Sequence, residues 1–424
     1  MPTSSSGSPA DPRGRRRSLL REDARFRRYF LGAATSLVGD RITFVAMPFA
    51  VLSVSNSAGS VAAVVAAQTV PFALLALFAG VIADRADRRR IVLTSDVVRM
   101  VTQVIAAVLL LSGSAEVWHL VVLMVCFGSA DAFFMPATQG MLPQLVAGPR
   151  LQEANALRGM VSSSAMIGGP ALAGVLVALL GPGGALAVDA GTFAVSAVCL
   201  AGVRPDPVRR LMREHEMVPS LLAGLREGWH EVRSRQWIGL GLSGFAVYTV
   251  VVLPAVFVLG PVIAERELGG AGAWAVISAT FGVGSLIGSA IALRWRPQRP
   301  MVVVAVGIAV GSAQAAVLGS GLSLPVIAAL EGITGIGVAL FFTIWDSALQ
   351  ERVPEQALSR VTSYDFFLSI GLSGLGVAIA GPVADLVGLQ QTMLAMSAIA
   401  VPLALSLLAF PAVRQLRRVE AGTS

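Results

Sequence analysis

Five acidic residues stand out inside long apolar stretches of this chain: Asp40, Asp131, Asp189, Glu331 and Asp365. A charged side chain at the centre of a bilayer costs about 2.5 to 3.5 kcal/mol on insertion scales, so acids at such depth usually face a cavity, a partner or a proton pathway. A carboxyl group beside an apolar cavity can also exchange a proton near neutral pH. These residues are therefore candidates for binding a proton or a substrate inside a membrane.

Asp40 and its neighbour Arg41 are the deepest charged pair in the first apolar stretch. Adjacent helical residues point about 100° apart, so the two side chains are expected to find different partners. We expect Arg41 to pair with Asp131 or Glu331. Two hypotheses remain for Asp40, Asp131 and Glu331: each either takes part in proton coupling or substrate binding, or forms a structural ion pair.

The remaining charges within apolar stretches, two of the five acids among them, are expected to have structural or gating roles. Asp96 and Arg99 are three residues apart, the spacing of a salt bridge on one helix face, and we place this bridge near the membrane surface. Asp189 is expected to brace its own helix, and Asp365 to belong to a gate at the cytoplasmic surface.

The elements that must position these charges are membrane helices. Of the 424 residues, 55% are hydrophobic and 13% charged, and the mean hydropathy is +0.75. Apolar runs of about 18 to 25 residues can each cross a bilayer as a helix. The predicted fold class is an all-α integral membrane protein with twelve spans, at Tyr29 to Val51, Gly59 to Ala83, Ile91 to Leu111, Val117 to Ala137, Gly159 to Gly181, Gly184 to Val203, Trp237 to Leu259, Ala273 to Leu293, Met301 to Leu318, Leu324 to Trp345, Val361 to Val383, and Thr392 to Phe410.

The arginines predict the orientation. All 32 basic residues are Arg, and twelve crossings place 29 of them on the side of both termini and one, Arg266, on the other side. An excess of Arg marks the cytoplasmic side. We therefore expect both termini in the cytoplasm and a protein of the bacterial cytoplasmic (inner) membrane.

Two halves of the chain resemble each other weakly. A shift of about 208 residues aligns Ala132–Val146 with Leu340–Pro354, and one residue less aligns Gly181 with Gly388. This repeat predicts two pseudo-symmetric six-helix bundles, with a site near the membrane midplane where the bundles meet. The predicted segments are a disordered cytoplasmic arm (1–28), the first bundle (29–203), a cytoplasmic linker (204–236), the second bundle (237–411) and a cytoplasmic tail (412–424).

The short polar stretch between the second and third spans, GVIADRADRRR, resembles the signature loop of the major facilitator superfamily. The matching residues are Gly80, Asp84, Arg85, Arg88 and Arg89. Asp87 departs from the pattern, because a glycine is usual there.

The resemblance implies that this loop forms a cytoplasmic latch. Asp84 would dock against the start of the eleventh helix, near Arg360 and Val361, and hold the two bundles together when the transporter faces outward. The alternative is a basic loop that only orients the protein.

The fifth span carries a second family pattern, in MIGGPALAGVLV. Gly169, Pro170, Ala173 and Gly174 resemble the glycine-proline motif of antiporting exporters. Small residues also permit close helix packing by themselves, so ordinary packing is the alternative.

Longer stretches, among them RRYFLGAATSLVGDRITFVAMPFAV, resemble the bacterial branch that contains macrolide efflux pumps and enterobactin-type siderophore exporters. The resemblance implies an exporter of a small hydrophobic or amphiphilic compound, driven by proton antiport. An importer of a small nutrient is the second hypothesis, and a membrane sensor or enzyme the third. The expected partners are the lipid bilayer, a small-molecule substrate and protons, with no nucleic acid, cofactor or metal, and we expect a monomer.

Overall fold

The computed structural model describes residues 19–146, 148–203, 232–353, 361 and 372–417, and these form helices without any strand. The helices are α1 (Leu19–Glu22), α2 (Ala24–Val54), α3 (Ala58–Arg85), α4 (Arg88–Leu111), α5 (Val117–Leu145), α6 (Gly148–Ala201), α9 (Gln236–Val247), α10 (Gly260–Ile263), α11 (Ala271–Arg294), α12 (Pro300–Ser312), α13 (Gln314–Leu318), α14 (Leu324–Arg352), α16 (Ser373–Val387), α17 (Leu389–Ser406) and α18 (Pro411–Arg414). Short π-helical segments η1 (Tyr248–Val252), η2 (Ala255–Leu259) and η3 (Ala264–Leu268) flank α10, and a 3₁₀ turn, η5 (Leu407–Ala409), follows α17.

The described helices agree with the twelve predicted crossings. Ten helical segments are long and apolar enough to cross a membrane, and α16 is a shorter apolar helix. One of the ten contains two crossings, because α6 turns sharply at Gly181, whose φ of 71° is not helical. Eleven segments with one divided in two give twelve crossings.

The turn at Gly181 has a counterpart in the second half of the chain. Gly388, which separates α16 from α17, also has a positive φ, 106°. Only glycine adopts such φ values without a steric penalty. The weak sequence repeat that aligned these two glycines therefore corresponds to the same tight turn in both halves.

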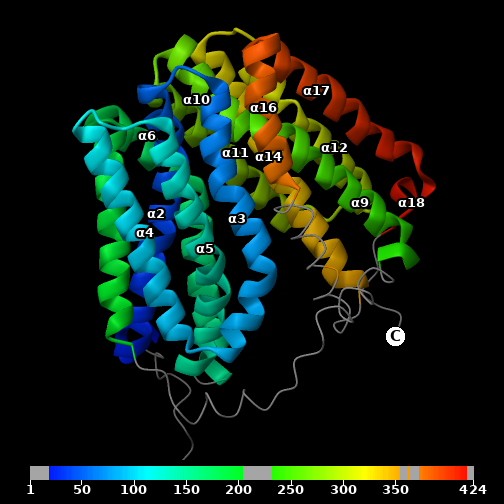
Figure 1. Ribbon diagram of the computed structural model, residues 1–424. Coiled ribbons are helices and arrows are strands. Elements are labelled where there is room, and N and C mark those ends of the chain that lie inside the picture. The colour runs from blue at the N-terminus through cyan, green and yellow to red at the C-terminus, as the bar shows by residue number, and fades with distance from the viewer. Residues whose placement is uncertain (1–18, 147, 204–231, 354–360, 362–371, 418–424) are drawn as a thin grey trace, which may run out of the picture.

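The helices pack as two bundles (Figure 1). In the first, α2 packs on α6, while α5 contacts both α3 and α4; in the second, α14 packs on α11 and α12, and α17 on α12. The halves meet along two seams, α3 with α16 and α6 with α11. This arrangement bears out the predicted fold of two six-helix bundles.

Small residues allow the backbones to approach at both seams. A Cβ atom on Gly174 of α6 would lie 2.6 Å from the Cβ of Ala275 on α11, and one on Gly381 of α16 would lie 2.3 Å from the carbonyl oxygen of Ala58 on α3. Both distances are too short for a larger side chain, so glycine sets the spacing of the halves.

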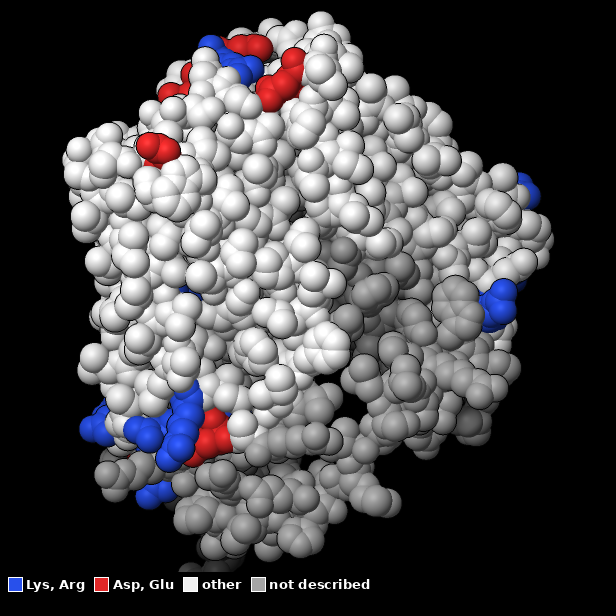
Figure 2. Space-filling model, viewed as in Figure 1, with Lys and Arg blue, Asp and Glu red and all other residues white. Residues whose placement is uncertain are grey.

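The described charges divide between the two ends of the bundle. Most arginines lie at the end where α2 begins and α14 finishes, called here the Arg-rich end; at the opposite, Arg-poor end, Arg266 is the one arginine of the described residues. Figure 2 shows the same division on one face, with a basic cluster near the bottom and mainly acidic side chains at the top.

Candidate functional site

Arg99, midway along α4, is the centre of a buried charge cluster in the first half. Its Nη1 donates to Asp40 Oδ1 of α2 at 2.9 Å and to Asp131 Oδ1 of α5 at 3.1 Å. Its Nη2 donates to Asp96 Oδ1 at 2.6 Å and to Ser36 Oγ at 2.9 Å. The Arg99 cluster, defined by these five residues, therefore joins three different helices.

Aromatic rings and hydroxyl groups complete the surroundings of the cluster. The Arg99 guanidinium lies 4.0 Å from the ring centroid of Phe134 and 4.6 Å from that of Phe193, close enough for cation–π attraction. Ser196 of α6 donates to Asp96 Oδ2 at 2.6 Å, so both oxygens of this carboxylate are bonded. These contacts fix the position of the guanidinium.

Charge and exposure differ among the three acids of the cluster. Asp96 and Arg99 are fully buried, whereas the side chains of Asp40 and Asp131 are each 23% exposed. One guanidinium cannot neutralise three carboxylates, and a buried net charge is costly. Protonation of an accessible carboxyl group relieves that imbalance, so the arrangement can take up and release a proton.

The predicted partner of Arg41 is wrong. Asp131 pairs with Arg99 instead, and the Arg41 side chain forms no hydrogen bond or ion pair with the described residues; its Nε is buried without a partner. Arg41 lies against α6, since a Cβ on Gly169 would be 2.5 Å from its Cβ. Asp40 and Arg41 do have different surroundings, as their spacing predicted.

The predicted surface location of Arg99 is also wrong. The expected bridge between Asp96 and Arg99 forms, but it lies in the interior and is only one of three ion pairs of Arg99. The sequence position of Arg99 could have predicted its interior location, because Arg99 lies midway between the ends of the third apolar run. Ser36 and Ser196 were missed for another reason, since single serines are common in membrane helices and carry no distinctive spacing.

Asp189 of α6 is, like Asp96, a fully buried acid of the first half. Thr43 donates to its Oδ2, and Gln103 donates to the Thr43 hydroxyl at 2.7 Å. Among the described residues it forms no ion pair. These bonds tie α6 to α2 and α4, in agreement with the predicted bracing role.

Glu331 of α14 is fully buried in the second half, and the described side chains that bond to it are neutral. Its Oε2 accepts from Gln314 Nε2 at 2.8 Å and from Thr334 Oγ1 at 2.9 Å, while Oε1 has no partner. Tyr248 lies next in this network, 3.5 Å from Gln314 Oε1. No described cation pairs with Glu331, so the predicted bond with Arg41 is absent.

The predicted latch is only partly described. The helical backbone of α3 includes Gly80, Asp84 and Arg85, but their side chains lie outside the described set, as do Arg360 and Asp365 altogether. The latch therefore remains a prediction.

Two basic residues of the loop contact helices of their own half. Arg88 donates to the Gly140 carbonyl at 2.6 Å, and Arg89 donates to the carbonyl of Ala201, at the end of α6. Asp87, where the family pattern has glycine, caps α4 by accepting from the Arg89 and Arg90 amides. Such a cap satisfies amide groups that a helix start leaves free.

The glycine-proline motif of α6 faces in two directions. Gly169 packs on Arg41 and Gly174 packs on α11 across the seam. Ala173 is fully buried beside them, and Pro170 lies within the helix. The motif thus connects the charged centre of the first half with the second half.

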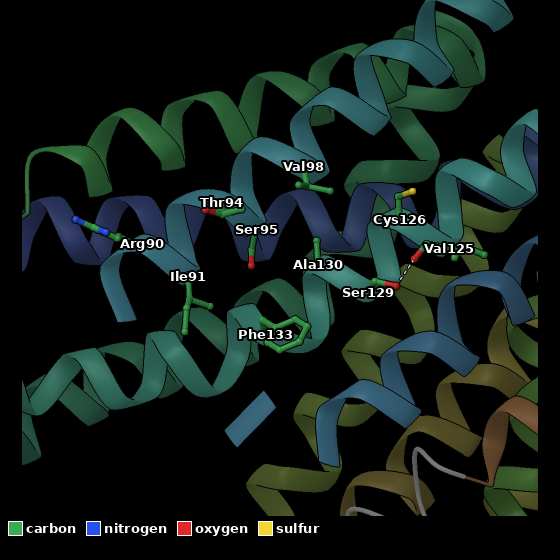
Figure 3. A pocket seen from close by; sticks show the side chains of 10 residues that line it. All are labelled: Arg90, Ile91, Thr94, Ser95, Val98, Val125, Cys126, Ser129, Ala130 and Phe133. Carbon is green, nitrogen blue, oxygen red and sulfur yellow. Dashed lines mark hydrogen bonds between the residues drawn. The ribbon is translucent and has the colours of Figure 1, made fainter. Parts of the chain in front are cut away.

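A groove of about 570 Å³ lies between α4 and α5, away from this centre. Figure 3 shows its lining, with Arg90 at one end and Phe133, Ser129 and Cys126 along α5. These three residues lie on the face of α5 opposite Asp131, as helical spacing requires. The groove is therefore distinct from the central pocket predicted between the halves.

Comparison with known families agrees with the fold. Residues 29–375 match the Major Facilitator Superfamily. The multidrug efflux pump Tap of Mycolicibacterium fortuitum is 30% identical over 382 residues, which cover 86% of this chain and 90% of that protein. Macrolide efflux protein A of Streptococcus pyogenes is 21% identical over 402 residues, 93% of this chain and 97% of that protein.

Among solved structures, a bacterial homologue of the human lysosomal transporter Spinster, in an inward-facing and occupied conformation, superposes with a TM-score of 0.71. It is 14% identical, and the match covers 93% of this chain and 98% of that one. At this identity the likeness concerns the fold alone.

Proposed function

Since the chain belongs to the Major Facilitator Superfamily, we propose that it is a secondary active transporter that exports a small hydrophobic or amphiphilic compound in exchange for protons. Export is favoured by relatives named as multidrug and macrolide efflux proteins, which match nearly the whole chain. The exported compound is then a drug, an antibiotic or a siderophore.

The observation that carries proton coupling is the composition of the Arg99 cluster. Three carboxyl groups surround one guanidinium, and two of them, Asp40 and Asp131, are partly exposed. Paired or cavity-facing acids of this kind mark proton relays in transporters. Loading and unloading of Asp40 changes the net charge at the centre of the first half, which can bias the two halves toward one orientation.

The inward movement of protons supplies enough free energy to expel the compound against a concentration gradient. A proton that moves inward across 100 mV supplies about 2.3 kcal/mol, and a pH gradient adds to it. Alternating access in such folds occurs by rocking of one bundle against the other around a site at their interface.

The chain is proposed to act as a monomer in the bacterial cytoplasmic membrane, with both termini in the cytoplasm. The Arg-rich end then faces the cytoplasm, as the distribution of positive charge favours.

Efflux is tested in a bacterial host that lacks its own drug exporters. Expression of the chain should raise resistance to at least one compound of a panel that includes a macrolide, and Asp40→Asn should abolish this effect. Glu116→Gln, a change of an exposed acid at the start of α5, is the matched control and should retain resistance. Unchanged susceptibility across the panel, with the protein present in the membrane, would contradict drug export.

Proton coupling is measured directly in inside-out vesicles from the same host. Addition of the expelled compound should release protons from an acidified lumen with the wild-type chain and not with Asp40→Asn. An importer, the alternative function, would not load such vesicles. Coupling that survives in Asp40→Asn would assign Asp40 a structural role.

A further inference from the structure

The Arg-poor end contains a contact between the halves that involves α3 and α16. Asp385, in the last turn of α16, accepts from Ser57 Oγ at 2.7 Å, from the Ala58 amide at 3.1 Å and from the Gly59 amide at 2.8 Å. Ser57 is the N-cap of α3. An acid from the second half therefore caps a helix of the first half, 328 positions away from Ser57 in the sequence.

The chemistry of this contact is favourable and specific. The first amides of a helix have no partner within the helix, and the helix dipole adds positive potential there, so a carboxylate is stabilised. Both oxygens of Asp385 are used. A Cβ on Gly59 would lie 2.8 Å from Oδ2, so glycine at this position admits the carboxylate.

A second link holds the same turn. Arg266 of η3 donates through Nε to Asn56 Oδ1 at 3.1 Å and through Nη2 to the Asn56 carbonyl at 2.5 Å. Its neighbour Glu267 accepts from Gln390, at the start of α17, at 2.8 Å. Two segments of the second half, α16 and η3, thus bind the turn between α2 and α3.

Below the contact, α3 and α16 remain packed toward the middle of the membrane. Gly381 lies against Ala58, and Gly374 approaches Val70, whose Cγ2 would be 3.2 Å from an added Cβ. The two helices run side by side in the centre of Figure 1. The Asp385 contact therefore closes one end of a seam that continues along both helices.

We propose that Asp385 is a gating residue of the transport cycle, whose carboxylate holds the halves closed at the Arg-poor end and must leave α3 whenever that end opens. The role of Asp385 in a transport cycle rests on the proposed function. It uses the same pair of helices as the latch predicted at the Arg-rich end, with the roles exchanged. There, Asp84 at the end of the second helix would dock on the start of the eleventh; here, the end of the eleventh docks on the start of the second.

The test measures the separation of the halves by electron–electron double resonance between two nitroxide labels. Ser114→Cys and Leu322→Cys place one exposed label in each half, on turns at the Arg-poor end, in the full chain carrying Cys126→Ser and Cys199→Ser. The purified protein is placed in nanodiscs without substrate or proton gradient. Asp385→Asn should increase the ratio of the long-distance to the short-distance population by about threefold to tenfold, the effect expected when charge-assisted hydrogen bonds to one carboxylate are weakened.

The matched control is Asp23→Asn. Asp23 also caps a helix, because it accepts from the Arg25 and Phe26 amides of α2, but that contact lies within one half. This variant should leave the two populations unchanged. Arg266→Gln weakens the link between Arg266 and Asn56 and should shift the two populations in the same direction as Asp385→Asn. It replaces Asp385→Asn as the test variant if that protein does not fold.

An unchanged distance distribution in folded Asp385→Asn, or in folded Arg266→Gln if the first variant does not fold, would overturn the proposal. An equal shift in Asp23→Asn would overturn it as well, since the effect would then not depend on the seam. The measurement does not require transport, so an Asp385→Asn shift in a chain that exports nothing from the panel would contradict the proposed function and support the gate.

Discussion

Asp131 and Glu331 occupy the fourth and tenth membrane helices, which correspond in the two halves, yet their surroundings are opposite. Asp131 shares Arg99 with two other acids and is 23% exposed. Glu331 is fully buried, and the described side chains that donate to it, those of Gln314 and Thr334, are neutral. Among the described residues, the first half thus concentrates charge, whereas the second half buries Glu331 without a described partner of opposite sign.

The difference indicates a division of tasks between the halves. A cluster with more carboxyl groups than cations changes its net charge when a proton arrives, and its accessible members can exchange that proton. An isolated buried acid is held at lowest cost in its neutral form, because an unpaired buried charge is far more costly than a hydrogen-bonded neutral group. We therefore expect substitutions at the Arg99 cluster to alter coupling, stability or both, according to the residue changed, and substitution at Glu331 to alter neither strongly.

The largest effect is expected from Arg99→Leu. Removal of the guanidinium leaves Asp40, Asp96 and Asp131 without their cation, and breaking a buried pair in this way typically costs about 3 to 5 kcal/mol of unfolding free energy. Denaturation in mixed micelles should show this loss, and export should stop. Arg414→Ala, at the exposed end of α18, is the control and should change the unfolding free energy little.

The double variant Arg99→Leu with Asp96→Asn sharpens this result. If uncompensated charge causes the instability, the second substitution should recover part of the lost unfolding free energy. Equal stability of Arg99→Leu and the wild type would show that the ion pairs do not hold the first half together.

An intermediate effect separates the acids within the cluster. Asp96 is fully buried and bonded to Arg99, Ser36 and Ser196, so Asp96→Asn should lower the unfolding free energy by about 1 to 3 kcal/mol while proton release persists. Asp131→Asn should change the unfolding free energy by less than about 1 kcal/mol, because the loss of one hydrogen bond from Arg99 is offset by relief of the excess negative charge in the cluster.

Proton release from inside-out vesicles is the second measurement that distinguishes these two variants. It should be lost in Asp131→Asn, in contrast to Asp96→Asn. The reverse pattern, coupling lost in Asp96→Asn and kept in Asp131→Asn, would contradict the assignment of the exposed acids as proton carriers.

The smallest effect is expected from Glu331→Gln. Glutamine can accept the hydrogen bonds of Gln314 and Thr334 with nearly the same shape, so the unfolding free energy should change by less than about 1 kcal/mol. Export and proton release should continue. Loss of proton release in this variant would make Glu331 a second proton carrier and remove the contrast between the halves.

The fold could be predicted from the sequence in considerable detail. The length of the apolar runs gave twelve crossings, and the described helices agree. Gly181 and Gly388, aligned by a weak repeat, form the same kind of turn. These features depend on composition and local conformation, which are properties of short segments.

The site could be predicted only in part. Asp40, Asp131 and Glu331 were identified as candidate site residues because charge inside an apolar run is costly wherever the run packs. Their partners were not identified, since Arg41 and Arg99 are both arginines within apolar runs, and helical periodicity does not tell which neighbouring helix each one faces.

By itself the sequence determined the number of membrane crossings, the sided distribution of arginine and the depth of the acids, because each follows from the solvation of individual side chains along the chain. Tertiary structure alone decided that Arg99 gathers three acids from three helices and that Asp385 caps α3 across the seam. Such contacts depend on the rotation and spacing of packed helices, which the sequence of one helix does not fix; at the two seams, small residues set that spacing.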